Sequence, residues 1–241
     1  MKFMFMHRTN AHWESGAAPT MELVRKVGEM VGEVVRSGRL VAADGLRASS
    51  QGVRLNFVNG KRTLTKGPLA GNNELIAGFA AMKVRSLDEA IEWSTKFANA
   101  IGDVEIDIRP ATEPWDIGLG AKPEGLTTRR YIAMHKATAN SEAGAPPTET
   151  QMQRVGALIE EMTKAGVLLS TAGIAPSRTA VRVRNFGGKK SMVDGPFAES
   201  KELVGGFAII DLDSKAAAID WALRYVDVLG EVELDILQVQ G

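Results

Sequence analysis

Apolar residues recur along the chain with two different periods, which predict an ordered series of helices and strands. Four valines between residues 24 and 34 return every three or four positions, the spacing of one helix face. Thr20 precedes this stretch as a helix cap and Gly38 follows it as a stop signal, so a helix is predicted over 21–36. The same pattern predicts a second helix over 149–164, between Thr148 and Gly166.

Short apolar runs rich in β-branched and aromatic residues predict strands between these helices. Asn59-Gly60 lies between two such runs and is a strong signal for a hairpin turn. Further helices are expected to end near Gly102 and Gly230. The expected strands cover residues 3–7, 40–45, 53–57, 62–65, 75–84 and 104–108, and then 131–135, 168–173, 203–212 and 232–237.

The chain repeats itself at an offset of 128 residues. Residues 1–108 align with 129–236 without a gap, and 36 of the 108 pairs are identical. The segment between the copies is rich in proline and glycine, which is typical of a linker. We therefore divide the chain into a first repeat over 1–112, a linker over 113–128 and a second repeat over 129–241.

Each copy has the order β-α-β-hairpin-β-α-β, which predicts a ferredoxin-like unit with an inserted hairpin. A sheet with helices on one face only should alternate apolar and polar residues. The runs 3–6 and 204–210 do not alternate, so both faces of each sheet are expected to be buried. The predicted fold is α+β: two ferredoxin-like repeats packed through their sheets as a fused dimeric α/β barrel.

Composition narrows the possible functions. The chain has 29 basic and 29 acidic residues, so no charge excess favours nucleic acid or a membrane surface. No apolar run is long enough to span a bilayer, and the apolar start is too short for a signal peptide, so a cytoplasmic protein is expected. The absence of cysteine excludes disulfides, thiolate metal sites and a cysteine nucleophile. We expect neither a cofactor nor a metal.

A block of the second repeat is similar to a known family. Asp194-Gly195-Pro196-Phe197, followed by Gly205-Gly206-Phe207, resembles the YCII-related proteins of the DGPF type. The resemblance covers both repeats and implies a dimeric α/β barrel, formed here by two fused copies. The family has no settled biochemical activity. Its genes often neighbour those of extracytoplasmic-function sigma factors, which implies a regulatory or stress context.

The candidate catalytic residues are His135 and Asp194. His7 and His135 are the histidines that both copies keep, each at the end of a first strand, where a group that titrates near neutral pH could act as a general base. Hydrogen bonding to neighbouring backbone is the structural alternative. Asp194 could act as a base or ligand acceptor at a cleft, or it could only initiate the turn at Gly195-Pro196.

His7, Glu74, Arg182 and Glu202 are the candidate ligand-binding residues. The two glutamates precede the long strands of the two copies and could instead pair with Arg54 and Arg182 on the hairpins. The glycines at 78 and 206, inside strands, are expected to permit close packing or a bulge.

Two functions stay open at this point. The first is binding of a small molecule in a cleft of the barrel, with cofactor-free acid–base chemistry. The second is a non-catalytic regulatory or scaffold role through a protein partner. The fused pair forms a pseudo-dimer within one chain, and its edge strands leave assembly into a homo-oligomer open.

Overall fold

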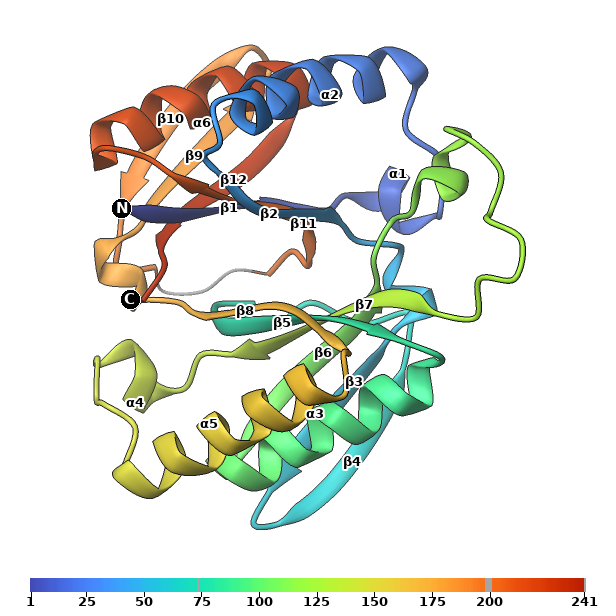
Figure 1. The fold of residues 1–241 in the computed structure, drawn as a ribbon. Helices are drawn as coiled ribbons and strands as arrows, with labels where there is room; N and C mark the ends of the chain where they lie inside the picture. Colours follow the sequence, from blue (N-terminus) through green and yellow to red (C-terminus); the bar gives the residue numbers. More distant parts are fainter. Residues whose placement is uncertain (73, 198–200, 241) are drawn as a thin grey trace.

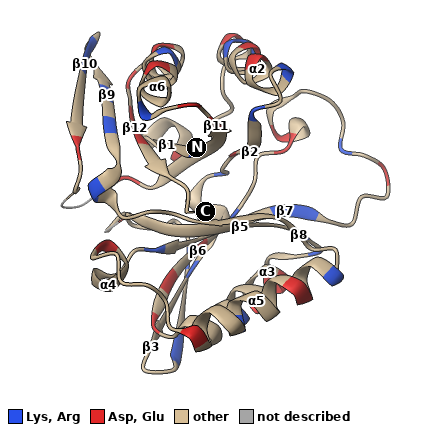
Figure 2. Ribbon diagram, turned by 60° about the vertical axis from the view of Figure 1, so that its left-hand side comes forward, with Lys and Arg blue, Asp and Glu red and all other residues tan. Residues whose placement is uncertain are grey.

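The structure is a computed structural model that describes residues 1–72, 74–197 and 201–240. It has four layers, with two β-sheets face to face in the middle and a pair of helices on each outer side (Figure 1). Basic and acidic residues are interspersed over the outer helices (Figure 2). No helix in the described part of the chain is long and apolar enough to cross a membrane.

The first sheet has six antiparallel strands in the order β10-β9-β12-β1-β11-β2. Helices α2 (Met21–Arg36) and α6 (Lys215–Leu229) cover its outer face (Figure 1). Thr20 caps α2 as predicted, because its side chain accepts a hydrogen bond from the backbone of Leu23. The strands are β1 (Lys2–Arg8), β2 (Leu40–Gly45), β9 (Val181–Phe186), β10 (Lys189–Asp194), β11 (Val204–Asp211) and β12 (Val232–Gln238).

The second sheet has the matching order β4-β3-β6-β7-β5-β8. Helices α3 (Leu87–Ile101) and α5 (Glu149–Lys164) cover its outer face (Figure 1). The short helices α1 (Ala11–Glu14) and α4 (Ala139–Glu142) follow the first strand of each repeat. The strands are β3 (Val53–Val58), β4 (Lys61–Lys66), β5 (Ile76–Val84), β6 (Val104–Pro110), β7 (Arg129–Lys136) and β8 (Leu168–Gly173).

The two repeats exchange their first halves, which the sequence pattern did not predict. Strands β1 and β2 of the first repeat complete the sheet of β9 to β12, whereas β7 and β8 of the second repeat complete the sheet of β3 to β6. Each ferredoxin-like unit is therefore a hybrid of both repeats. In this arrangement the connection from β6 to β7, residues 111–128, joins two strands that pair with each other.

A designed disulfide tests this exchange, because the natural chain has no cysteine. Ala80 on β5 lies opposite Ala133 on β7, so Ala80→Cys with Ala133→Cys should form an intramolecular disulfide on mild oxidation. The control pair, Lys2→Cys with Lys83→Cys, would face each other only if β1 paired with β5. It should stay reduced. Peptide mass spectrometry distinguishes the two, and a disulfide in the control pair alone would disprove the exchange.

Three apolar clusters fill the spaces between the layers. The cluster between the sheets explains why the strands do not alternate, since β1 buries Phe5 toward the helices and Met4 and Met6 toward the other sheet. The prediction that two sheets pack face to face is confirmed. Strand pairing does not close a barrel, however: each sheet has two open edges, and the sheets are joined by the single bridges Leu46–Ala111 and Ile174–Val239.

Two buried ion clusters at equivalent positions also tie the repeats together. In one, Asp235 of β12 accepts hydrogen bonds from Arg182 of β9 and from Arg8 of β1. In the other, Asp107 of β6 pairs with Arg54 of β3 and with Lys136 of β7. Each cluster joins a carboxylate of one repeat to a cation of the other, so each links the two repeats within one sheet.

Candidate functional site

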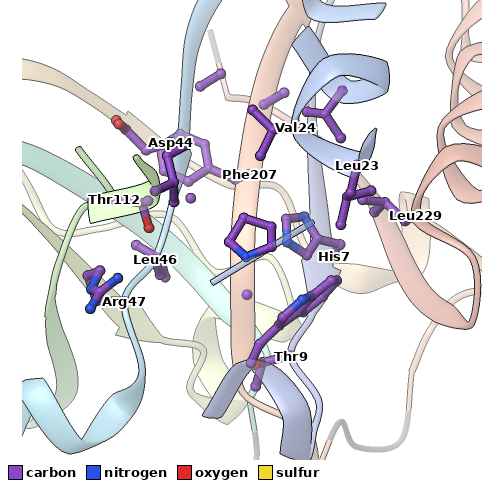
Figure 3. Close-up of a pocket in the computed structure, with 18 of the residues that line it drawn as sticks. His7, Thr9, Leu23, Val24, Asp44, Leu46, Arg47, Thr112, Phe207 and Leu229 are labelled. Carbon is purple, nitrogen blue, oxygen red and sulfur yellow. The ribbon is translucent and has the colours of Figure 1, made fainter. Parts of the chain in front are cut away.

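A cavity of about 420 Å³ lies between α2 and the first sheet. Its walls come from both repeats and from the linker, and most of them are apolar. Figure 3 shows Asp44, Leu46, Arg47 and Thr112 on one side and His7, Leu23 and Leu229 on the other. The aromatic and polar residues that line it are His7, Thr9, Trp13, Asp44, Arg47, Thr112, Phe207 and Tyr225.

His7 is held at the end of β1 by its aromatic neighbours. Its ring centre lies 5.5 Å from that of Trp13 and 6.2 Å from that of Tyr225, both in edge-to-face geometry. Burial, together with the Arg8 and Arg109 cations, lowers the pKa of His7 to about 4. The imidazole is therefore neutral at pH 7. Its Nδ1 is buried and has no hydrogen-bond partner among the described residues.

Glycines on the neighbouring strands make room for the two histidine rings that the repeats share. A Cβ at Gly206 of β11 would lie 2.6 Å from Cε1 of His7, and a Cβ at Gly78 of β5 would lie 2.5 Å from Nε2 of His135. The expectation that these glycines permit close packing is confirmed. The packing partner in each case is the histidine of the other repeat.

Asp44 is the second titratable group of the cavity. It lies on β2, and Arg130 at the start of β7 donates a hydrogen bond to its carboxylate. Burial, with a further contribution from Glu113, raises the pKa of Asp44 to about 6 in spite of Arg130. The cavity thus combines a neutral imidazole with a carboxyl that exchanges its proton near neutral pH, a combination able to move a proton on a bound molecule.

The linker forms one wall of this cavity. Ile117 and Leu119 line it, and Ile117 ends the short helix η2 (Pro114–Ile117). Ion pairs fix the linker to β7, with Arg129 binding Asp116 and Arg130 binding Glu113. A segment that joins the two repeats therefore also shapes the site.

An equivalent but much smaller cavity of about 70 Å³ lies beneath α5. His135 lines it, with its ring centre 5.0 Å from that of Phe97. Its remaining walls are almost wholly apolar. At the positions 128 residues apart, Trp13, Asp44, Arg47 and Tyr225 correspond to Ser141, Ala172, Ala175 and Phe97. Of these four, Ala172 and Phe97 line the smaller cavity.

The two predicted catalytic residues do not come together. His135 lies in the smaller cavity against the second sheet, whereas Asp194 ends β10, the edge strand of the first. The Asp194 side chain is 84% exposed, and its carboxylate lies 3.7 Å from Nζ of Lys215. His135 and Asp194 therefore do not line a common site.

Of the four predicted ligand-binding residues, the structure places His7 alone in the large cavity. Glu74 is buried and pairs with Arg54 at 2.9 Å and with Lys136. The structure thus has the Arg54 pair that was one alternative for Glu74, in the interior and not at the surface. Arg182 is buried against Asp235 and stacks over the ring of Phe197 at 4.2 Å. Glu202 is exposed, and its backbone carbonyl accepts a hydrogen bond from Arg8.

Sequence reasoning missed Asp44, Arg47, Trp13 and Tyr225. A signal for them exists in the repeat alignment, since each is replaced by a smaller or less polar residue in the other copy. Within the described part of the chain no three His, Asp or Glu side chains are grouped as metal ligands.

The comparisons with known proteins agree with the duplicated architecture. The model of the YCII-related domain matches residues 1–106 and again residues 130–228. An uncharacterized protein of Rhizobium meliloti (strain 1021) is 36% identical over 74 residues, a stretch that covers 31% of this chain and 60% of that protein. No solved structure matches the chain. With two matches that together span most of its length, the chain belongs to the YCII-related family.

Proposed function

We propose that this protein binds a small, largely apolar organic molecule in the cavity beneath α2, with His7 and Asp44 as its acid–base groups. The observation that carries this proposal is the cavity itself. At about 420 Å³ it is within the range of ligand sites, and polar groups interrupt its apolar walls at a few points.

The state of His7 supports a binding role. A buried polar atom without a partner costs about 1–3 kcal/mol of stability, so the unpartnered Nδ1 needs an explanation other than packing. Neutral imidazole has one donor and one acceptor nitrogen, which suits a ligand with a carbonyl or hydroxyl group. Since His7 and Asp44 need no metal to exchange protons, the chemistry that this site favours is cofactor-free proton transfer.

Gly28 gives a sharp test of the cavity as a ligand site. It lines the cavity from α2, and a Cβ built on it meets nothing within 4 Å. The Phe side chain of Gly28→Phe therefore starts in open space at the cavity wall, where its ring is expected to occupy the cavity. Removing a helical glycine should keep stability equal or raise it by about 0.5–1 kcal/mol. We expect this variant to lose binding of N-phenyl-1-naphthylamine, a neutral apolar dye whose fluorescence rises on burial.

Gly156→Phe is the matched control, because Gly156 has the equivalent place on α5, also meets nothing within 4 Å, and lines neither cavity. It should bind the dye as the wild type does. Equal binding by all three proteins, or no binding by the wild type, would contradict the proposed function.

A further inference from the structure

Arg47 differs from the other cations around the large cavity. It lies in the segment that crosses from the first sheet to the second, and its main chain is fixed: its N–H donates to the carbonyl of Pro110 at 2.9 Å, and its carbonyl accepts from Nε of Arg109 at 2.9 Å. Its side chain lines the cavity next to Leu46 and Thr112 (Figure 3).

The Arg47 guanidinium has no hydrogen bond or ion pair with any residue that the structure describes, and its Nε is buried. The neighbouring arginines are all compensated. Arg109 pairs with Glu14 at 3.0 Å, Arg129 pairs with Asp116, and Arg130 pairs with Glu113 at 3.0 Å. One uncompensated, partly buried cation thus remains in a mainly apolar cavity, where an unpaired charge is unfavourable.

The carboxylate in the same cavity does not satisfy Arg47. Asp44 is bound by Arg130, which also pairs with Glu113, so the cation nearest to the Asp44 carboxylate is Arg130 and not Arg47. At the opposite wall, the Arg8 and Arg109 cations act on His7 and disfavour a positive charge there. The electrostatic field around His7 and Arg47 therefore favours a negative group brought in by a ligand.

We propose that Arg47 binds an anionic group of the ligand, so that the molecule recognised is an apolar body with one carboxylate-type charge. This inference rests on the proposed function and adds the ligand class to it. Arginine suits the task because its planar fork of N–H donors matches a carboxylate in two parallel hydrogen bonds. The equivalent position of the second repeat is Ala175, and no cation lines the smaller cavity among the described residues.

Two competitors of the same shape test whether a negative charge on the ligand strengthens its binding. In wild-type protein with N-phenyl-1-naphthylamine bound, 2-naphthoate should displace the dye at a concentration about tenfold or more below that needed for the neutral 2-naphthamide. In Arg47→Met, which keeps the apolar stem, the dye should still bind and the two competitors should become equal. Arg154→Met removes an exposed arginine of α5 and should keep the wild-type preference.

The possible outcomes distinguish failure of the anionic subsite from failure of the proposed function. If Gly28→Phe abolishes dye binding but naphthoate and naphthamide compete equally in the wild type, the cavity binds ligands and the anionic subsite is disproved. A naphthoate preference that survives in Arg47→Met would also disprove it, because the anion would then bind another cation. If Gly28→Phe leaves dye binding unchanged, the proposed function fails, and this inference fails with it.

Discussion

Replacing Asp235 with alanine is expected to lower the free energy of unfolding by about 3–5 kcal/mol, because it leaves buried cations without their partner. Asp235 is 1% exposed and accepts hydrogen bonds from Nε of Arg182 at 2.6 Å and from Nη2 of Arg182 at 3.0 Å, besides one from Arg8. Arg8 and Arg182 are themselves buried. Urea denaturation of Asp235→Ala against the wild type measures the loss.

Asp227→Ala is the matched control for Asp235→Ala. The Asp227 side chain is 58% exposed and pairs with Lys190 at the surface, so its removal should change stability by at most about 1 kcal/mol. Similar small losses in both variants would show that the buried cluster does not hold the repeats together.

Acid should destabilise the protein through its buried histidines, and His135→Leu should reduce that effect. Burial lowers the pKa of His135 to about 4, although a backbone hydrogen bond with Lys136 acts in the other direction. In the unfolded chain histidine titrates near 6.5. The contribution of neutral, buried His135 to the free energy of unfolding is therefore complete above about pH 6.5. It is lost as the pH falls toward 4, about 2 kcal/mol of it by pH 5.

Wild type and His135→Leu must be compared with each other, because the effect of acid on the stability of either protein alone also includes Asp44, which responds in the opposite sense. Its pKa is raised to about 6, so the folded state gains stability as Asp44 takes up its proton. Urea denaturation near pH 7.5 and near pH 5 measures how much the free energy of unfolding falls between the two pH values. This fall should be about 2 kcal/mol smaller in His135→Leu than in the wild type. Phe97→Leu, a neighbouring change without a titratable group, should keep the wild-type loss. An equal loss in His135→Leu would contradict the prediction.

Local patterns in the sequence predicted most of the fold. The helix over 21–36, its Thr20 cap and the hairpin at Asn59-Gly60 follow from periodicity and turn chemistry, and the structure has all three. The non-alternating run at the start of β1 predicted the buried second face. The exchange of strands could not be predicted this way, because two similar repeats offer equivalent partners and pairing is decided by the path of the connections.

The proposed cavity was not predicted from the sequence, for a related reason. His135 and Asp194 were chosen because a retained histidine and a motif aspartate carry recognisable chemistry. The large cavity is lined instead by residues that have no counterpart in the second repeat, such as Asp44 and Arg47. Their role emerges only when the distant segments of both repeats and the linker are placed around one space.

The linker occurs once in the chain, and this has an evolutionary consequence. When two identical subunits associate, every substitution appears in both of their pockets, and neither can change alone. In this chain Ile117 and Leu119 wall one pocket and have no counterpart at the other. Joining the copies end to end therefore allows each pocket to change independently: one is wide and has several polar groups among its apolar walls, while the other is small and closed around His135.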